Sequence, residues 1–137
     1  MIDPEVITRR IEKLREYVKY LRELGERSKD QFISDPFVYG NVERFLHLAI
    51  QSVLDIGSHI IAAKHLETPE EYQDIFRILG EEGILPEKFA KSLQPMAGLR
   101  NILVHDYLEV DREELYRIVK ENLKDFEIFA MHIAKLL

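Results

Sequence analysis

Apolar residues recur at steps of three and four along most of the chain, which is the spacing of amphipathic helices. Asp3 and Pro4 stand where an N-cap and a first helical residue are expected, and Gly25 followed by polar residues marks an end. We therefore expect a first helix from about Pro4 to Gly25. Its apolar stripe consists of Ile7, Ile11, Leu14, Val18 and Leu21.

A second helix should begin between Asp35 and Asn41 and run to about Lys64. Its apolar residues cover more than one face, which indicates two neighbours. A second subunit is a candidate for one of them. The first stripe consists of Val42, Phe45, Ala49, Val53, Ile56 and Ile60, and Leu46, Ile50, Leu54 and Ile61 widen it.

Two shorter helices should follow. The sequence from Thr68 to Glu71 reads as a capping box with proline at the first helical position, so it predicts a helix to Leu79 with Gly80 just past its end. Pro86 opens the next helix, and Pro95 removes a backbone donor within it, which predicts a kink.

Asp111 and Glu114 form another predicted capping box, which would open a long last helix. Its stripe contains Leu115, Ile118, Val119, Asn122, Phe126, Phe129, Ile133 and Leu136. No alternating segment indicates a strand, and no repeat or linker divides the chain. We predict one all-α domain over residues 1–137: an antiparallel up-down four-helix bundle with an additional short helix.

Composition narrows the class of protein. The 137 residues suit a single domain, and the chain has no cysteine, so neither disulfides nor thiolate-bound zinc belong to its design. No apolar run looks long enough to cross a bilayer and the N-terminus lacks a signal pattern, so we expect a cytoplasmic protein without a membrane partner. The net charge of −6 argues against non-specific coating of nucleic acid.

The candidate chemistry lies in the sequence GLRNILVHDY, residues 98–107. Asn101 and His105 are four residues apart and share a helix face, and the long side chain of Arg100 can reach the same groove. Histidine can take and give a proton near neutral pH, and arginine offers a fork of donors to phosphate oxygens. RNA supplies its own 2′-hydroxyl nucleophile, so such a set suits RNA cleavage without a metal.

Residues 100–107 read as R-N-x3-H-x-Y, which resembles the R-x4-6-H motif of HEPN domains. The form ending in tyrosine resembles the HepT-like toxins of the HepT–MntA toxin–antitoxin systems. Residues 42–61, VERFLHLAIQSVLDIGSHII, and residues 76–111, from FRILGEEGILPEKF through the motif to LEVD, resemble the same family. The resemblance thus extends over nearly the whole chain.

That resemblance implies a HEPN-like homodimer that brings two motifs into one cleft and a metal-independent endoribonuclease with no cofactor. It implies catalytic roles for Arg100 and His105, with Asn101 positioning the substrate. Its antitoxin partner, an MntA-like nucleotidyltransferase, would add AMP to Tyr107. The alternative is a non-catalytic HEPN subunit that binds nucleotides or the nucleotidyltransferase, which the net charge of −6 favours.

Structural interpretations of the same residues are simpler. Arg100 could pair with an acid, His105 could cap helix carbonyls, Asn101 could be exposed, and Tyr107 could cover the end of the bundle.

Two acid–histidine pairs occur at four-residue spacing on the second helix, Glu43 with His47 and Asp55 with His59. No Glu-x-x-His supports a di-metal bundle site, so we interpret them as intrahelical pairs and assign no metal. Asp55 or His59 is also a candidate to support the cleft.

Overall fold

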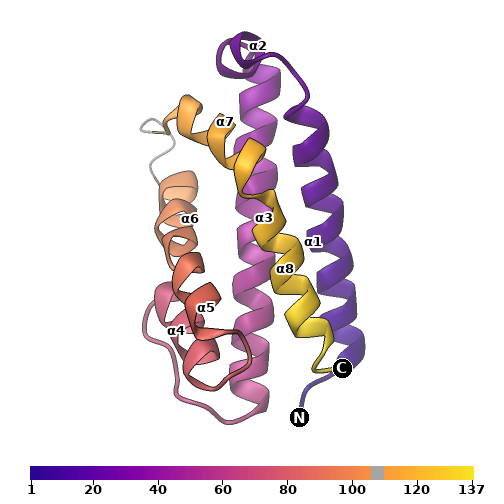
Figure 1. The fold of residues 1–137 in the computed structure, drawn as a ribbon, viewed down its shortest axis with the longest axis vertical. Coiled ribbons are helices and arrows are strands. Elements are labelled where there is room, and N and C mark those ends of the chain that lie inside the picture. The colour runs from indigo at the N-terminus through magenta and orange to yellow at the C-terminus, as the bar shows by residue number, and fades with distance from the viewer. Residues whose placement is uncertain (106–109) are drawn as a thin grey trace.

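The computed structural model describes residues 1–105 and 110–137, and two long helices run side by side along it (Figure 1). They are α1 (Pro4–Leu24) and α3 (Pro36–Ala63). The start of α1 is as predicted, because the side chain of Asp3 accepts hydrogen bonds from the N–H groups of Glu5 and Val6. Asp35 caps α3 in the same way and Lys64 follows its last residue, which confirms the predicted span.

A short helix, α2 (Lys29–Ser34), connects α1 to α3. The polar residues after Gly25 indicate only the end of the first helix and do not predict this element. The side chain of Ser28 caps α2 by accepting a hydrogen bond from Gln31, and Phe32 is its one buried residue. A helix of this length with one buried side chain leaves too little apolar periodicity to be found in the sequence.

Helix α4 (Tyr72–Glu81) begins later than predicted. The N-cap is Glu71, not Thr68, and the carboxylate of Asp74 accepts the Glu71 N–H at 3.0 Å. Gly80 lies inside the helix, and Gly83 beyond it adopts a φ of 73°, which only glycine takes up readily. The cap and stop signals were each placed about one turn too early.

Pro95 does more than kink the predicted fourth helix. It ends one helix and starts another, α5 (Glu87–Leu93) and α6 (Pro95–His105), with Gln94 between them. Proline is favoured at the first position of a helix because no hydrogen bond is lost there. Residue 86 is the N-cap of α5 and not its first helical residue. The motif is therefore carried by a short helix of its own.

The long last helix predicted after Asp111 is also two helices. These are α7 (Arg112–Glu121) and α8 (Leu123–Ala134), separated at Asn122. The side chain of Asp111 caps α7 as predicted, accepting from Glu113 and Glu114. The apolar stripe continues through Asn122, so periodicity alone could not reveal the break.

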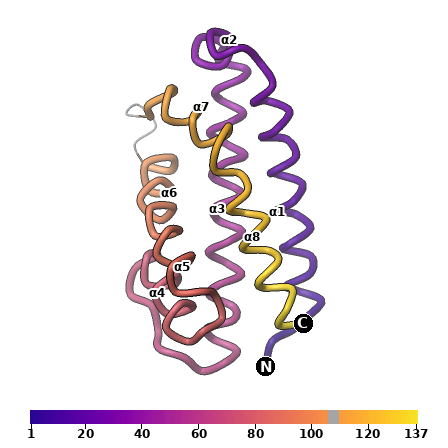
Figure 2. Tube along the Cα trace, viewed as in Figure 1, coloured from indigo at the N-terminus to yellow at the C-terminus, as the bar shows by residue number. Residues whose placement is uncertain are grey.

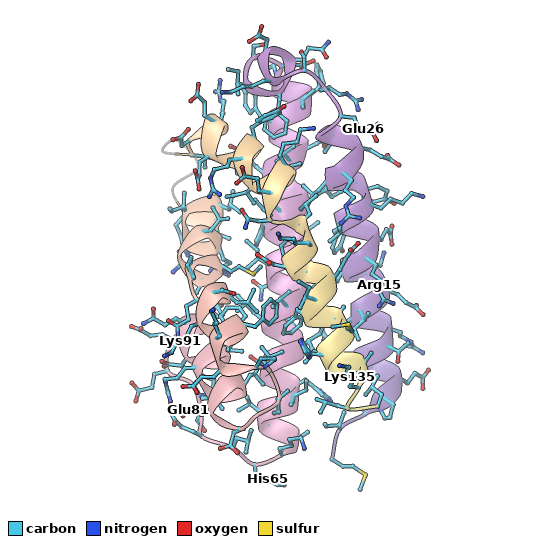
Figure 3. All side chains as sticks on the ribbon, in the orientation of Figure 1. Arg15, Glu26, His65, Glu81, Lys91 and Lys135 are labelled. Atoms are coloured by element: carbon cyan, nitrogen blue, oxygen red, sulfur yellow. The ribbon has the colours of Figure 1, made fainter. Side chains whose placement is uncertain are left out.

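The core lies around α3. Helices α1 and α8 cover part of it, and α4, α5 and α6 form a group on another side, as the Cα trace shows (Figure 2). Both neighbours predicted for α3 are thus available within the chain. The α1 side chains of the predicted stripe are at most 5% exposed. Labelled charged residues such as Arg15, Glu26 and Lys91 project outward (Figure 3).

Helix α3 corrects one expectation. With 28 residues and a mean hydropathy of 1.4 in its most apolar window, it is long and apolar enough to cross a membrane by length and composition. Half of that window is buried inside the bundle, where the helix packs against α1, α4 and α6. In this protein the apolar residues of α3 that would suit a bilayer pack in the core of the bundle.

Candidate functional site

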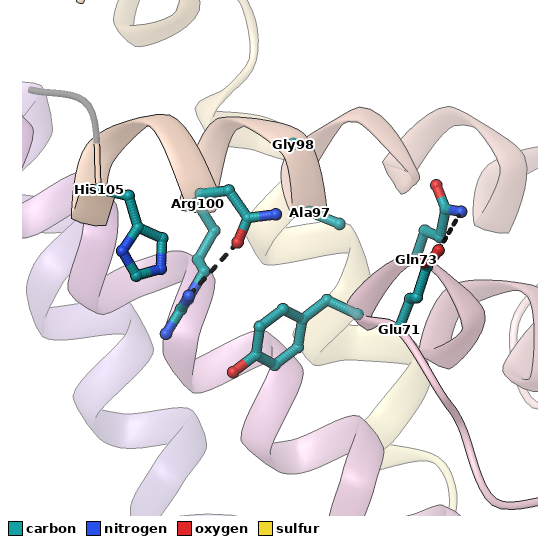
Figure 4. Close-up of a pocket in the computed structure, with 8 residues that line it drawn as sticks. Glu71, Gln73, Ala97, Gly98, Arg100 and His105 are labelled. Carbon is teal, nitrogen blue, oxygen red and sulfur yellow. Dashed lines mark hydrogen bonds between the residues drawn. The ribbon is translucent and has the colours of Figure 1, made fainter.

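An open cleft of about 590 Å³ lies between the start of α4 and helix α6 (Figure 4). Arg100 and His105 project from α6 toward the same side, although they are five residues apart. Asn101 also lines the cleft, so the structure gathers three of the predicted site residues. The fourth, Tyr107, lies outside the described residues. The lining consists of Glu71, Tyr72, Gln73, Ala97, Gly98, Arg100, Asn101 and His105.

The guanidinium of Arg100 is held from three directions. Its Nε donates to the Oε1 of Gln51 at 3.2 Å, and its Nη1 donates to the Oδ1 of Asn101 at 3.3 Å. The guanidinium carbon lies 4.7 Å from the centre of the Tyr72 ring. Asn101, an exposed helix residue, thus also contacts the arginine beside it.

The simpler interpretation of Arg100, a pair with an acid, does not hold among residues 1–105 and 110–137. Its recorded hydrogen bonds there go to two amide oxygens. By contrast, Arg77 pairs with Glu67 and Glu81, which hold its pKa above the ordinary value. Because amide partners carry no net charge, the positive charge of Arg100 faces the cleft without a carboxylate partner from the described part of the chain.

His105 is the last residue of α6, and its side chain is exposed. In Figure 4 the imidazole and the guanidinium of Arg100 point to the same side of α6, and both residues line the cleft. An imidazole and a guanidinium, groups suited to proton transfer and to phosphate binding, therefore share one side of α6.

Gln51 on α3 was not singled out in the sequence. Besides accepting from Arg100, its Nε2 donates to the Oδ1 of Asp55 at 2.9 Å. The Oδ2 of Asp55 lies 3.3 Å from the Nη1 of Arg10 on α1. The spacing of Gln51 and Asp55 on one helix face was visible in the sequence, but their relation to Arg100 depends on how α3 packs against α6.

The predicted intrahelical acid–histidine pairs are wrong. Asp55 bonds to Gln51 and Arg10, while the Nε2 of His59 accepts the backbone N–H of Asp3 at 3.4 Å. Of the two candidates to support the cleft, Asp55 reaches Arg100 through Gln51. In the described ranges, no three His, Cys, Asp or Glu side chains are grouped so as to hold a metal ion.

Glu43 and His47, the other predicted pair, are each perturbed by burial and not by one another. Desolvation raises the pKa of Glu43, and the charge of Arg112 partly opposes it. Desolvation lowers the pKa of His47, and the nearby charges of Arg44 and Arg100 lower it further.

Residues 7–133 match the model of the family described as Ribonuclease HepT-like. The mRNA nuclease HepT of Shewanella oneidensis is 28% identical over 128 residues, which cover 91% of this chain and 93% of that protein. The tRNA nuclease HepT of Aphanizomenon flos-aquae is 30% identical over 134 residues, covering 96% and 90%.

Solved structures show the same fold. The tri-AMPylated Shewanella oneidensis HEPN toxin, in complex with its MNT antitoxin, superposes with a TM-score of 0.88 at 28% identity, covering 98% of this chain and 99% of that one. The cytosolic protein YutE of Bacillus subtilis superposes with a TM-score of 0.77 at 29% identity, covering 93% and 87%. The family model and these relatives each match this chain over nearly all of the helical bundle. The chain therefore belongs to the ribonuclease HepT-like family of HEPN domains.

Proposed function

We propose that this protein is the toxin of a toxin–antitoxin pair and acts as a metal-independent endoribonuclease. The observation that carries the proposal is the cleft in which Arg100, Asn101 and His105 meet. The nuclease activities of the Shewanella and Aphanizomenon relatives support the same reaction class. The cytosolic relative YutE supports a cytoplasmic location.

In the proposed reaction, a 2′-hydroxyl of RNA attacks the adjacent phosphorus and the bond to the 5′-oxygen breaks. His105 takes the hydroxyl proton, and an imidazolium returns a proton to the leaving oxygen, so a 2′,3′-cyclic phosphate and a 5′-hydroxyl result. Arg100 binds the phosphate oxygens, whose charge spreads in the transition state. Such proton transfer contributes roughly 10²–10⁴-fold, and a placed donor about 10²–10³-fold.

A homodimer fits this reaction because it would supply two histidines, one as base and one as acid. Helix α6 presents apolar surface for such a contact, since Ile102, within the motif, is 42% exposed. Each copy would then contribute its Arg100 and His105 to a shared cleft.

Regulation would act on Tyr107, which follows His105 by two residues. We propose that a nucleotidyltransferase antitoxin adds AMP to its hydroxyl. The Shewanella toxin, which is tri-AMPylated in complex with its antitoxin, supports this modification. The added phosphate would be an anion attached seven residues after Arg100 in the sequence, and we propose that it competes with RNA for the donors of that arginine.

The deciding experiment measures RNA cleavage by the pure protein in the presence and absence of a chelator. Cleavage should resist the chelator and be lost in Arg100→Ala and in His105→Ala, while both variants unfold at the wild-type denaturant concentration. Arg15→Ala, at an exposed position on α1, is the control and should cleave normally. Full cleavage by a folded His105→Ala would refute the catalytic assignment.

A non-catalytic subunit is the second candidate, and the net charge of −6 favours it because broad RNA binding draws on positive charge. In that case the protein would bind its nucleotidyltransferase partner but cleave none of a wide set of RNAs. The same assay therefore separates the two functions.

A further inference from the structure

We propose that Gln51 is a positioning residue for Arg100, and that Asp55 and Arg10 fix Gln51 in turn. The inference rests on the proposed ribonuclease function, because it assigns a role to a residue outside the motif in that reaction. Gln51 lies on α3, far from Arg100 in the sequence, and is partly buried between α3 and α6.

The supporting contacts form one chain through three helices. Arg100 on α6 donates to Gln51 on α3 at 3.2 Å, and Gln51 donates to Asp55 at 2.9 Å. Asp55 then accepts from Arg10 on α1 at 3.3 Å. Since α1 and α3 pack along one another, the far end of the chain is attached to the most extensive helix pair of the core.

The order of donors and acceptors fixes the amide of Gln51. A carboxylate only accepts, so Asp55 must receive the NH2 group of the glutamine. The Oε1 atom is thereby turned toward Arg100, whose guanidinium only donates. Were the amide reversed, its NH2 group would face a cation and its oxygen would face an anion, and both contacts would be lost.

These contacts fix the direction in which the guanidinium of Arg100 points before any substrate binds. Gln51 occupies the Nε donor, Asn101 one donor of Nη1, and the Tyr72 ring lies against the group at 4.7 Å. In residues 1–105 and 110–137 no hydrogen bond of Nη2 is recorded, and we assign its donors to a phosphate. A side chain that is oriented before the substrate arrives loses little freedom on binding and keeps its donors where negative charge develops.

The test uses variants of Gln51 that separate its acceptor from its size. Gln51→Leu removes the acceptor, and we expect kcat to fall about ten- to a hundredfold with an unchanged unfolding midpoint. Gln51→Glu keeps an acceptor for the Nε–H of Arg100 but loses the donor to Asp55 and places two carboxylates together, so its kcat should fall as in Asp55→Leu although the Arg100 contact persists. Ser52→Ala, one residue along α3, is the control; its hydroxyl bonds the Leu48 carbonyl, and Ser52 does not line the cleft.

A nuclear magnetic resonance measurement follows the contact without relying on activity. The Nε–H proton of Arg100, assigned by its absence in Arg100→Lys, should exchange slowly with water in the wild type and in Gln51→Glu. It should exchange faster in Gln51→Leu. Asp55→Leu should lower kcat in the same direction, and it should add no further loss in the Gln51→Leu background because both act through one contact.

Failure of the positioning role can be distinguished from failure of the ribonuclease proposal. Wild-type kcat and unchanged Nε–H exchange in folded Gln51→Leu would overturn the positioning role and leave the ribonuclease proposal intact. If the wild type cleaves no RNA, the ribonuclease proposal fails, and binding of 2′-O-methyl RNA to the same variants then decides whether Gln51 orients Arg100 toward phosphate. If Gln51→Leu does not fold, Gln51→Met, which matches glutamine in length, carries the same expectations.

Discussion

The ring of Tyr72 lies 4.7 Å from the guanidinium carbon of Arg100, so an aromatic face from α4 meets a cation from α6. Such a contact contributes about 0.5–2 kcal/mol. Tyr72→Leu should therefore lower kcat by about two- to thirtyfold, on the scale of tenfold per 1.4 kcal/mol. Tyr72→Phe keeps the ring and should cleave RNA at nearly the wild-type rate. Equal losses in both variants would assign the effect to the hydroxyl and not to the ring.

Tyr107→Phe should remain toxic but escape neutralisation by the antitoxin. The variant lacks the hydroxyl that would accept AMP but keeps Arg100 and His105, so it should inhibit growth in the presence of the nucleotidyltransferase antitoxin. Intact-protein mass spectrometry should show AMP on the wild type and none on the variant. Silencing of Tyr107→Phe without modification at another tyrosine would contradict the assignment.

Replacing each of two glycines of α3 with alanine should change the free energy of unfolding in opposite directions. A Cβ on Gly57 would lie 2.5 Å from the Cγ2 of the buried Ile75, whereas a Cβ on Gly40 would meet no atom within 4 Å. Gly57→Ala should lower the free energy of unfolding by about 1–3 kcal/mol through overpacking against α4. Gly40→Ala should raise it by about 0.5–1 kcal/mol because alanine is the better helix former. Urea denaturation measures both, and a stabilised Gly57→Ala would show that α4 can move aside.

His47 should make stability depend on pH. Burial, followed by the charges of Arg44 and Arg100, holds its pKa below the ordinary value. Because the folded state binds this proton less readily than the unfolded chain, the contribution is present above about pH 6.5 and is lost as the pH falls through the folded pKa. His47→Gln should therefore lose less stability than the wild type on acidification over this range.

The same titration tests the link between His47 and the cleft. Removing the nearby cation in Arg100→Ala should raise the pKa of His47, as followed by its imidazole resonances. An unchanged pKa would show that burial alone determines the shift.

Much of the bundle was predictable because its helices carry local signals. Asp3 and Asp35 cap helices where the sequence indicates, and the buried stripe of α1 is the one that its periodicity predicts. The errors arose where a local signal was weak or misleading: one buried residue in α2, a cap-like sequence at Thr68 ahead of the Glu71 cap of α4, and an apolar stripe that runs unchanged through Asn122.

The site was predictable only as far as it lies within one helix. The spacing of Asn101 and His105 indicates a shared face of α6 that the long side chain of Arg100 can reach, and the structure places all three at one cleft. Gln51 and Tyr72 reach Arg100 from other helices, and their positions depend on tertiary packing that no local pattern encodes.

Helix α6 contributes few anchors to the core, since Ala97 is its one buried residue. Apolar burial supplies most of the driving force for folding, so substitutions at Arg100 or His105 should cost the bundle little. Loss-of-function alleles that still fold should therefore arise easily under selection against a harmful enzyme. Such silent copies would keep the outer surface of the active protein and could compete with it for the same antitoxin.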